Sequence, residues 1–160
     1  MTKTDIVELF EFVRKKTNDL LDAVAKLPDA AAVLGWRPGP GRAHLAWQLM
    51  HIGATDDRHL YIRMKGGEPK QPEYVRRFAG GSTPDDDIPT VETIRTYLAD
   101  RRREMLDHFR SLDDAALATK PNDQAPWTYQ EWVRVLVWHE GHHQGQGHLT
   151  LNLYKATHPS

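Results

Sequence analysis

The segment over residues 127–153 constrains the fold most, because it predicts one long amphipathic helix that carries two histidines on a single face. Thr128 and Glu131 have the spacing of a capping box, a pattern that marks the start of a helix. Beyond it, apolar and polar residues recur at intervals of three and four, which places His139 and His143 one turn apart. Two imidazoles at this spacing can bind one metal ion, so a third ligand has to come from elsewhere in the chain.

Three further amphipathic helices are expected over residues 5–26, 42–64 and 90–112, from apolar residues at helical spacing. The connection over residues 65–88 holds four glycines and three prolines and is long enough to travel the length of a helix. This length would let the second and third helices run parallel. Four helices without a convincing strand predict an all-α four-helix bundle, as a single domain over residues 1–160.

The composition excludes several classes of protein and partner. The chain has 160 residues, a formal charge of −1 and no cysteine, so metal ligands have to be histidines or carboxylates. A chain without a basic excess gives no reason to expect nucleic acid or an anionic membrane surface as a partner. Its first residues enter an amphipathic pattern directly, and no stretch of about twenty apolar residues occurs, so we expect a cytoplasmic protein.

His51 is the best candidate for the third ligand. In the expected helix over residues 42–64 it lies roughly 13 Å from the start and about 20 Å from the end, at 1.5 Å per residue. His139 and His143 lie about 17 to 23 Å from the start of their own helix. If the two helices are antiparallel neighbours, the three imidazoles meet at one level, although a lone buried histidine is more often a hydrogen-bonded core residue. The same face of the His51 helix also carries His44, Trp47, Gln48, Thr55 and Arg58.

The string from His139 to His143 also satisfies the H-E-x-x-H pattern of zinc peptidases. The extended pattern needs a glycine at position 146 and a histidine at position 149, where this chain has Gln146 and Leu149. No acidic residue follows Glu140 to serve as a downstream ligand either, so a peptidase is disfavoured.

Two residues are candidates for catalytic roles beside such a metal. Glu140 projects between the two ligand directions, where it could orient an imidazole or accept a proton; a surface or supporting carboxylate is an equally good interpretation. Gln146 follows His143 by about one turn and could hydrogen-bond a bound water. His142 points about 100° away from His143. His44 is expected at the mouth of the pocket, and His59 and His158 at the surface.

Two other features have alternative interpretations. Arg101, Arg102 and Arg103 are expected to form a solvated face; the alternative makes Arg101 an anion clamp, with its two neighbours turned outward. Gly141 and Gly145 cost stability inside a helix, which suggests that another backbone approaches them closely. That neighbour is the first or third helix, the connection over residues 65–88, or a second subunit of a homodimer.

Two pieces of the chain resemble the DinB-like superfamily. They read Leu-Ala-Trp-Gln-Leu-Met-His at residues 45–51 and His-Glu-Gly-His-His-Gln-Gly-Gln at residues 139–146. The resemblance implies a four-helix bundle of up-down-down-up topology, often dimeric, with a divalent metal, commonly zinc or nickel. Carried over to this sequence, the metal ligands are His51, His139 and His143. Relatives include S-transferases and isomerases that use low-molecular-weight thiols, and metal-dependent hydrolases.

These observations predict a metal-dependent enzyme that acts on a small molecule. Three neutral imidazoles leave coordination positions open, which is the pattern of a catalytic metal site. An ion held in this way lowers the pKa of a bound water or thiol, as hydrolase or S-transferase chemistry requires. The alternative is a non-catalytic helical bundle, in which the metal has a structural or stress-related role or the site has decayed.

Overall fold

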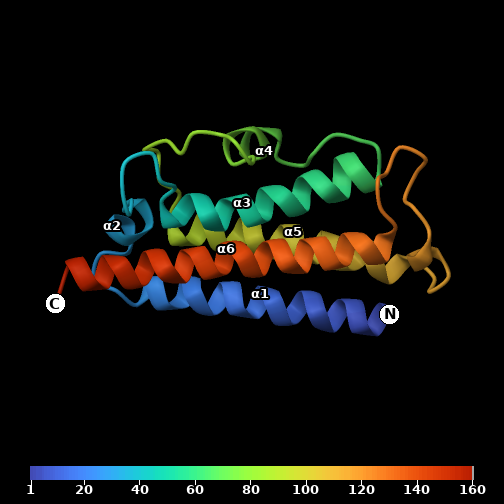
Figure 1. The fold of residues 1–160 in the computed structure, drawn as a ribbon, viewed down its shortest axis with the longest axis horizontal. Helices are drawn as coiled ribbons and strands as arrows, with labels where there is room; N and C mark the ends of the chain where they lie inside the picture. Colours follow the sequence, from blue (N-terminus) through green and yellow to red (C-terminus); the bar gives the residue numbers. More distant parts are fainter. Residues whose placement is uncertain (160) are drawn as a thin grey trace.

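The computed structural model describes residues 1–159, and four long helices dominate it. They are α1 (Lys3–Ala25), α3 (Leu45–Arg58), α5 (Val91–Ser111) and α6 (Tyr129–Thr157), and they lie side by side (Figure 1). Helices α1 and α3 each pack against both α5 and α6. In Figure 1, α3 and α5 run in one direction while α1 and α6 run in the other. The described residues contain no strand, which confirms the all-α expectation.

The helix that carries His51 begins three residues later than its pattern predicts. His44 is its N-cap, because the amide of Trp47 donates to Nδ1 of His44 over 3.0 Å. After Arg58 the helix continues as a π-helix, η1 (His59–Met64), which ends at the predicted residue. The capping box at Thr128 and Glu131 is confirmed at the start of α6, which runs four residues beyond its expected end at 153.

The connections carry three short helices, α2 (Ala30–Gly35), α4 (Pro72–Arg77) and η2 (Ala116–Ala118). We call residues 65–90, which contain α4, the crossover; it lies along α3 in Figure 1. Both carboxylate oxygens of the buried Asp57 hold it, by accepting from the amides of Lys70 and Gln71 over 2.9 Å each. On the other side of α4, the buried ring of Phe78 fixes the crossover. The crossover is therefore anchored to α3 on both sides of α4.

The core is divided into two apolar clusters by one polar layer. Each long helix contributes to this layer, which we call the charged layer, through Arg14, Thr17, Asp56, Arg102 and Glu140. One apolar cluster includes Leu20, Leu45 and Leu98, and the other includes Phe10, Leu60 and Phe109. Within residues 1–159, no helix is both long and apolar enough to cross a membrane.

Close helix packing at α6 depends on Gly147. A Cβ atom there would lie 2.7 Å from Cδ2 of Leu20 and 2.9 Å from Cδ1 of Leu45, so a larger residue fits only if these two buried side chains move. A Cβ atom on Gly141 or Gly145 would meet nothing within 4 Å. Neither a neighbouring helix nor the crossover therefore covers these two glycines, and that part of the expectation is wrong.

Candidate metal centre

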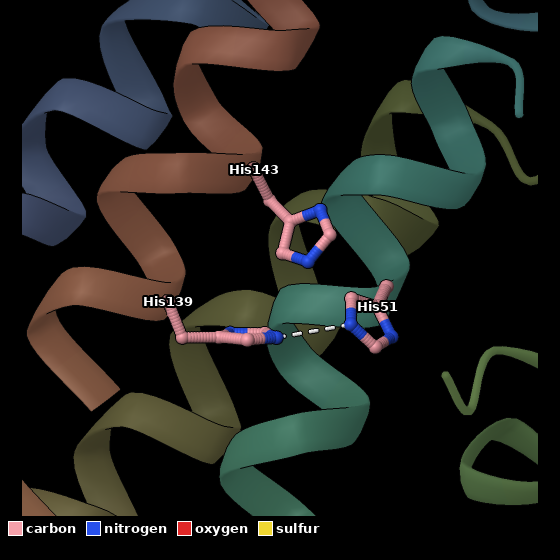
Figure 2. Close-up of side chains that lie close together, drawn as sticks. All are labelled: His51, His139 and His143. Atoms are coloured by element: carbon pink, nitrogen blue, oxygen red, sulfur yellow. Dashed lines mark hydrogen bonds between the residues drawn. The ribbon is translucent and has the colours of Figure 1, made fainter. Parts of the chain in front are cut away.

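Three histidines converge where α3 faces α6. One ligand nitrogen from each of His51, His139 and His143 lies within 4.8 Å of the other two (Figure 2). Nε2 of His51 is 3.0 Å from Nε2 of His139. Among residues 1–159, this is the one cluster of three or more histidine and acidic side chains with the spacing to share a metal ion. The convergence follows from the two helices: α6 supplies an i, i+4 pair and α3 supplies His51 at the same level.

Hydrogen bonds to Nδ1 leave Nε2 of two of these rings available as ligands. Nδ1 of His51 donates to the carbonyl oxygen of Phe78 over 2.6 Å, because a carbonyl can only accept. Nδ1 of His143 lies 2.6 Å from Oε1 of Gln48, which also accepts. Each ring therefore carries its proton on Nδ1 and a lone pair on Nε2. Trp47 stacks on His51 at 4.7 Å between ring centroids and holds that ring in place.

The environment keeps all three imidazoles in the neutral, ligating form. Burial lowers the pKa of His51. Burial, together with the neighbouring histidines, lowers the pKa of His139 to about 3 and that of His143 to about 4. Neutral imidazole suits both zinc and nickel, so the residues present fit a divalent metal.

A cleft of about 280 Å³ adjoins the cluster and gives it access to a small molecule. His51 and His139 line it, together with the polar side chains of Thr55, Arg58 and His59. Oγ1 of Thr55 lies 3.5 Å from Nε2 of His139. The remaining walls are largely apolar and come from α3, the crossover, α6 and the residue before the N-cap of α6, through Ala54, Val75, Ala79, Trp127, Val135 and Leu136.

Sequence comparison agrees with this geometry, since the profile of the DinB superfamily matches residues 9–146. The chain belongs to the DinB superfamily. Its fold is similar to a crystal structure described as that of the conserved protein of locus from Enterococcus faecalis, with a TM-score of 0.69 and 17% sequence identity. That likeness covers 96% of this chain and 97% of the other, and it concerns the fold alone. No curated protein gave a significant match.

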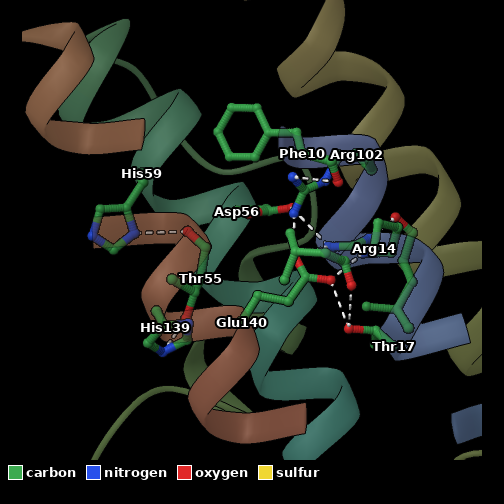
Figure 3. A network of polar contacts seen from close by, with 11 residues as sticks. Phe10, Arg14, Thr17, Thr55, Asp56, His59, Arg102, His139 and Glu140 are labelled. Carbon is green, nitrogen blue, oxygen red and sulfur yellow. Dashed lines mark hydrogen bonds and ion pairs between the residues drawn. The ribbon is translucent and has the colours of Figure 1, made fainter. Parts of the chain in front are cut away.

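In this member of the DinB superfamily, Glu140 belongs to the charged layer. Its carboxylate accepts from Nε of Arg14 over 2.6 Å and from Oγ1 of Thr17 over 2.8 Å, and it also pairs with Arg102 (Figure 3). Burial alone would raise the pKa of Glu140, but the two guanidinium groups lower it below its usual value. The carboxylate is thus directed away from the histidines, and these contacts do not support the catalytic role expected from the sequence.

Gln146 is half-buried on α6, next to His142 and His143. Its Nε2 atom is 3.0 Å from Nε2 of His142, whose ring stacks on the exposed Trp138. A side-chain hydrogen bond with Gln146 also acts to raise the pKa of His143, so Gln146 contacts a candidate ligand, and its expected bond to a bound water stays a prediction. His44, expected at the pocket mouth, is instead fully buried as the cap of α3.

Three sequence expectations about charged and polar residues are wrong. Arg102, expected to turn outward, is buried in the charged layer, where Asp56 lies 3.1 Å from it. Arg101 is also buried and pairs with Asp57 and Glu104, so it is neither solvated nor a free anion clamp. His59, expected at the surface, is half-buried in the cleft.

Sequence reasoning did not assign the residues that support the metal centre and the charged layer. Gln48 was placed on the His51 face but without a role, and the carbonyl of Phe78 has no sequence signature because every residue has one. Arg14 and Asp56 left a usable signal: each is a charge inside an otherwise apolar helical stripe. Buried charges need partners of opposite sign, so such stripe charges on different helices can be paired from the sequence.

Proposed function

We propose that this protein is a metal-dependent enzyme that activates a small thiol or water, as an S-transferase or a hydrolase does. His51, His139 and His143 would hold the divalent metal, with zinc or nickel preferred. The observation that carries the proposal is the convergence of three neutral imidazoles next to an open cleft, with Nδ1 of His51 and His143 already bonded within the chain. A purely structural site would have no need of the cleft.

The chain's own residues supply orientation and proton transfer. Phe78 and Gln48 fix the rings of His51 and His143, and the apolar walls of the cleft keep bulk water from a bound molecule. When bound, a divalent ion supplies positive charge that lowers the pKa of a thiol or water. No carboxylate lines the cleft among the described residues, so the proton has to pass to another base.

His59 is that base in our proposal. Its Nδ1 donates to the carbonyl of Thr55 over 2.7 Å, which leaves a lone pair on Nε2. Burial lowers the pKa of His59, so the ring is neutral and able to accept a proton at neutral pH. His59 thereby replaces Glu140 in the role that the sequence suggested.

The proposal extends to topology, assembly and location. The directions of the long helices support a four-helix bundle of up-down-down-up topology. A homodimer is supported by the uncovered Gly141 and Gly145, which lie between Trp138, 66% exposed, and Leu149, 61% exposed. We place the protein in the cytoplasm, with a small molecule as its partner and neither nucleic acid nor membrane.

Metal content tests the core of the proposal. Protein purified without a nickel column should contain about one equivalent of metal by elemental analysis. Replacing His51, His139 or His143 with alanine should weaken metal binding by more than about a hundredfold, since even a residue that only supports a ligand costs 10–100-fold. His142→Ala is the matched control and should keep its metal. Full metal content in His51→Ala would contradict the assignment, and thiol-transfer assays on metal-loaded protein then test the reaction.

Light scattering tests the assembly. The wild type should scatter as a dimer, and Gly145→Leu should shift it toward monomer, because the added side chain occupies the space that the partner needs. A monomeric wild type would exclude the dimer. An intact dimer in the variant would remove this face of α6 from the interface.

A further inference from the structure

The cleft beside the metal centre carries a positive charge without a negative one to balance it. Its polar lining consists of neutral side chains and Arg58, and no aspartate or glutamate among the described residues lines it. Arg58 itself makes no ion pair or hydrogen bond through its side chain within residues 1–159, whereas both arginines of the charged layer form ion pairs. A guanidinium that lines an apolar cleft without a partner is suited to an anion from outside the chain.

The position of Arg58 on α3 fixes the geometry of such a ligand. His51, Thr55 and Arg58 follow one another at i, i+4 and i+7, which places them on one face of the helix. The Cα atoms of His51 and Arg58 are about 10 Å apart along the axis, at 1.5 Å per residue. Side chains on a helix tend to lean toward its N-terminus, a direction that leads from Arg58 over Thr55 toward His51, and all three residues line the cleft.

We infer that Arg58 binds the carboxylate of a small organic acid whose other end reaches the metal centre. This inference rests on the function proposed above and names the substrate class of the same site. The apolar walls formed by Val75, Ala79 and Leu136 contact the hydrocarbon middle of the molecule, and the hydroxyl of Thr55 bonds it next to His139. The substrate is therefore an anion with an apolar centre, short enough for a cleft of about 280 Å³.

Paired probes that differ only in charge test this assignment. The first pair is 5-mercaptopentanoate and its amide, bound to zinc-loaded protein, and the second is hexanoate and hexanamide, which carry no thiol. Dissociation constants are measured by calorimetry or by NMR titration. In both pairs the acid should bind about tenfold tighter than the amide, as a charge-assisted hydrogen bond provides. The preference should shrink as salt is raised, because Arg58 is exposed.

Variants of Arg58 test whether this residue causes the preference for the acid over the amide. Arg58→Gln should remove the difference between acid and amide, and Arg58→Lys should keep part of it, because lysine retains the charge but not the planar fork. Arg63→Gln is the matched control: it removes the same charge from an exposed residue one turn further on, outside the cleft, and should leave the preference intact.

The two probe pairs separate failure of this inference from failure of the proposed function. Equal affinities of acid and amide in the wild type, or a preference that survives Arg58→Gln, would overturn the role of Arg58. If the thiol adds no affinity over hexanoate while the acid preference persists, the metal chemistry fails and the anion site stands. Because the second pair needs no metal, the role of Arg58 is decided in either case.

Discussion

Two polar clusters lie on opposite sides of α6 and begin at neighbouring residues, His139 in the metal centre and Glu140 in the charged layer (Figure 3). The charged layer contains as many cations as anions, because Arg14 and Arg102 face Asp56 and Glu140. Each carboxylate there is paired within the chain. The metal centre instead contains three neutral rings, and one ligand nitrogen of each lies within 4.8 Å of the other two.

The difference between them indicates which cluster awaits a ligand. Burying a polar group is costly unless it is hydrogen-bonded, so a native core completes its polar networks. In the charged layer, every carboxylate pairs with an arginine of another helix, and the layer connects all four long helices. At the metal centre, Nδ1 of His51 and of His143 is hydrogen-bonded to non-ligand groups of the chain, and Nε2 of His51 lies 3.0 Å from Nε2 of His139, beside a cleft. Stability is therefore expected to depend on the first cluster and binding on the second.

The largest expected effect comes from breaking the charged layer. Glu140→Gln leaves Arg14 and Arg102 with a single carboxylate partner, and removing one member of a buried ion pair costs about 3–5 kcal/mol. Urea unfolding should show this loss in the free energy of unfolding. Metal content per folded molecule should stay unchanged, since Glu140 does not contact the ligands.

Glu8→Gln is the matched control, because Glu8 is exposed, and its effect should stay within about 0.5 kcal/mol. If Glu140→Gln kept the wild-type stability but lost activity on metal-loaded protein, the separation of the two clusters would be wrong. Glu140 would then serve the metal centre after all.

Metal removal should have a smaller effect on stability. A metal that binds only the native state adds about 2.7 kcal/mol at a free concentration of 100 times Kd. For a chain of this size, a chelator should then lower Tm by roughly 5–10 °C, as measured by calorimetry. His51→Ala supplies the control, because a chelator should not change its melting curve. An unchanged wild-type curve after confirmed metal removal would show that the core alone fixes the geometry of the site.

The smallest effect concerns His44, a histidine whose hydrogen bonds are complete within the chain. Burial and the charge of Arg37 lower its pKa, against the opposing influence of Asp85. Protonation would remove the lone pair on Nδ1 that accepts from the amide of Trp47, and with it the cap of α3. Since the folded-state pKa lies below the ordinary value, the stabilisation is present above about pH 6.5 and is lost as pH falls below it.

His44→Asn tests this sign, because asparagine caps a helix at any pH. Relative to the wild type, the variant should gain about 1 kcal/mol as pH falls from 7 toward 5, in urea unfolding at each pH. His51, His139 and His143 shift stability in the same direction in both proteins, so the difference between the two curves isolates His44. Parallel curves would show that the cap is not titrated.

The long helices and the three histidines could be predicted from the sequence because their signals are local or periodic. The capping box at Thr128 involves neighbouring residues, and counting residues along two helices was enough to place His51 level with His139. Charge placement could not be read in the same way. Arg102 follows Arg101 and precedes Arg103, a run that looks solvated, and only Asp56 and Glu140 on other helices explain its burial.

The contribution of the crossover was also beyond the sequence pattern. Helix α4 has six residues, too few for a periodic signal, and the carbonyl of Phe78 that orients His51 is a backbone group. The packing of the glycines could not be predicted from the sequence either. Gly141 and Gly147 both lie inside the predicted helix, yet only Gly147 packs closely against other helices. The difference depends on which helices lie next to α6.

The hydrogen bond from His51 to Phe78 makes docking of the crossover and metal binding a linked equilibrium. The crossover supplies no ligand to the metal. Because linkage is reciprocal, docking of the crossover strengthens metal binding by the same factor by which metal strengthens docking of the crossover. The carboxylate of Asp57 holds the far end of the same segment. Loosening that anchor should therefore weaken metal binding without touching the ion. In return, bound metal should slow hydrogen exchange at the amides of Lys70 and Gln71, on the other side of α4.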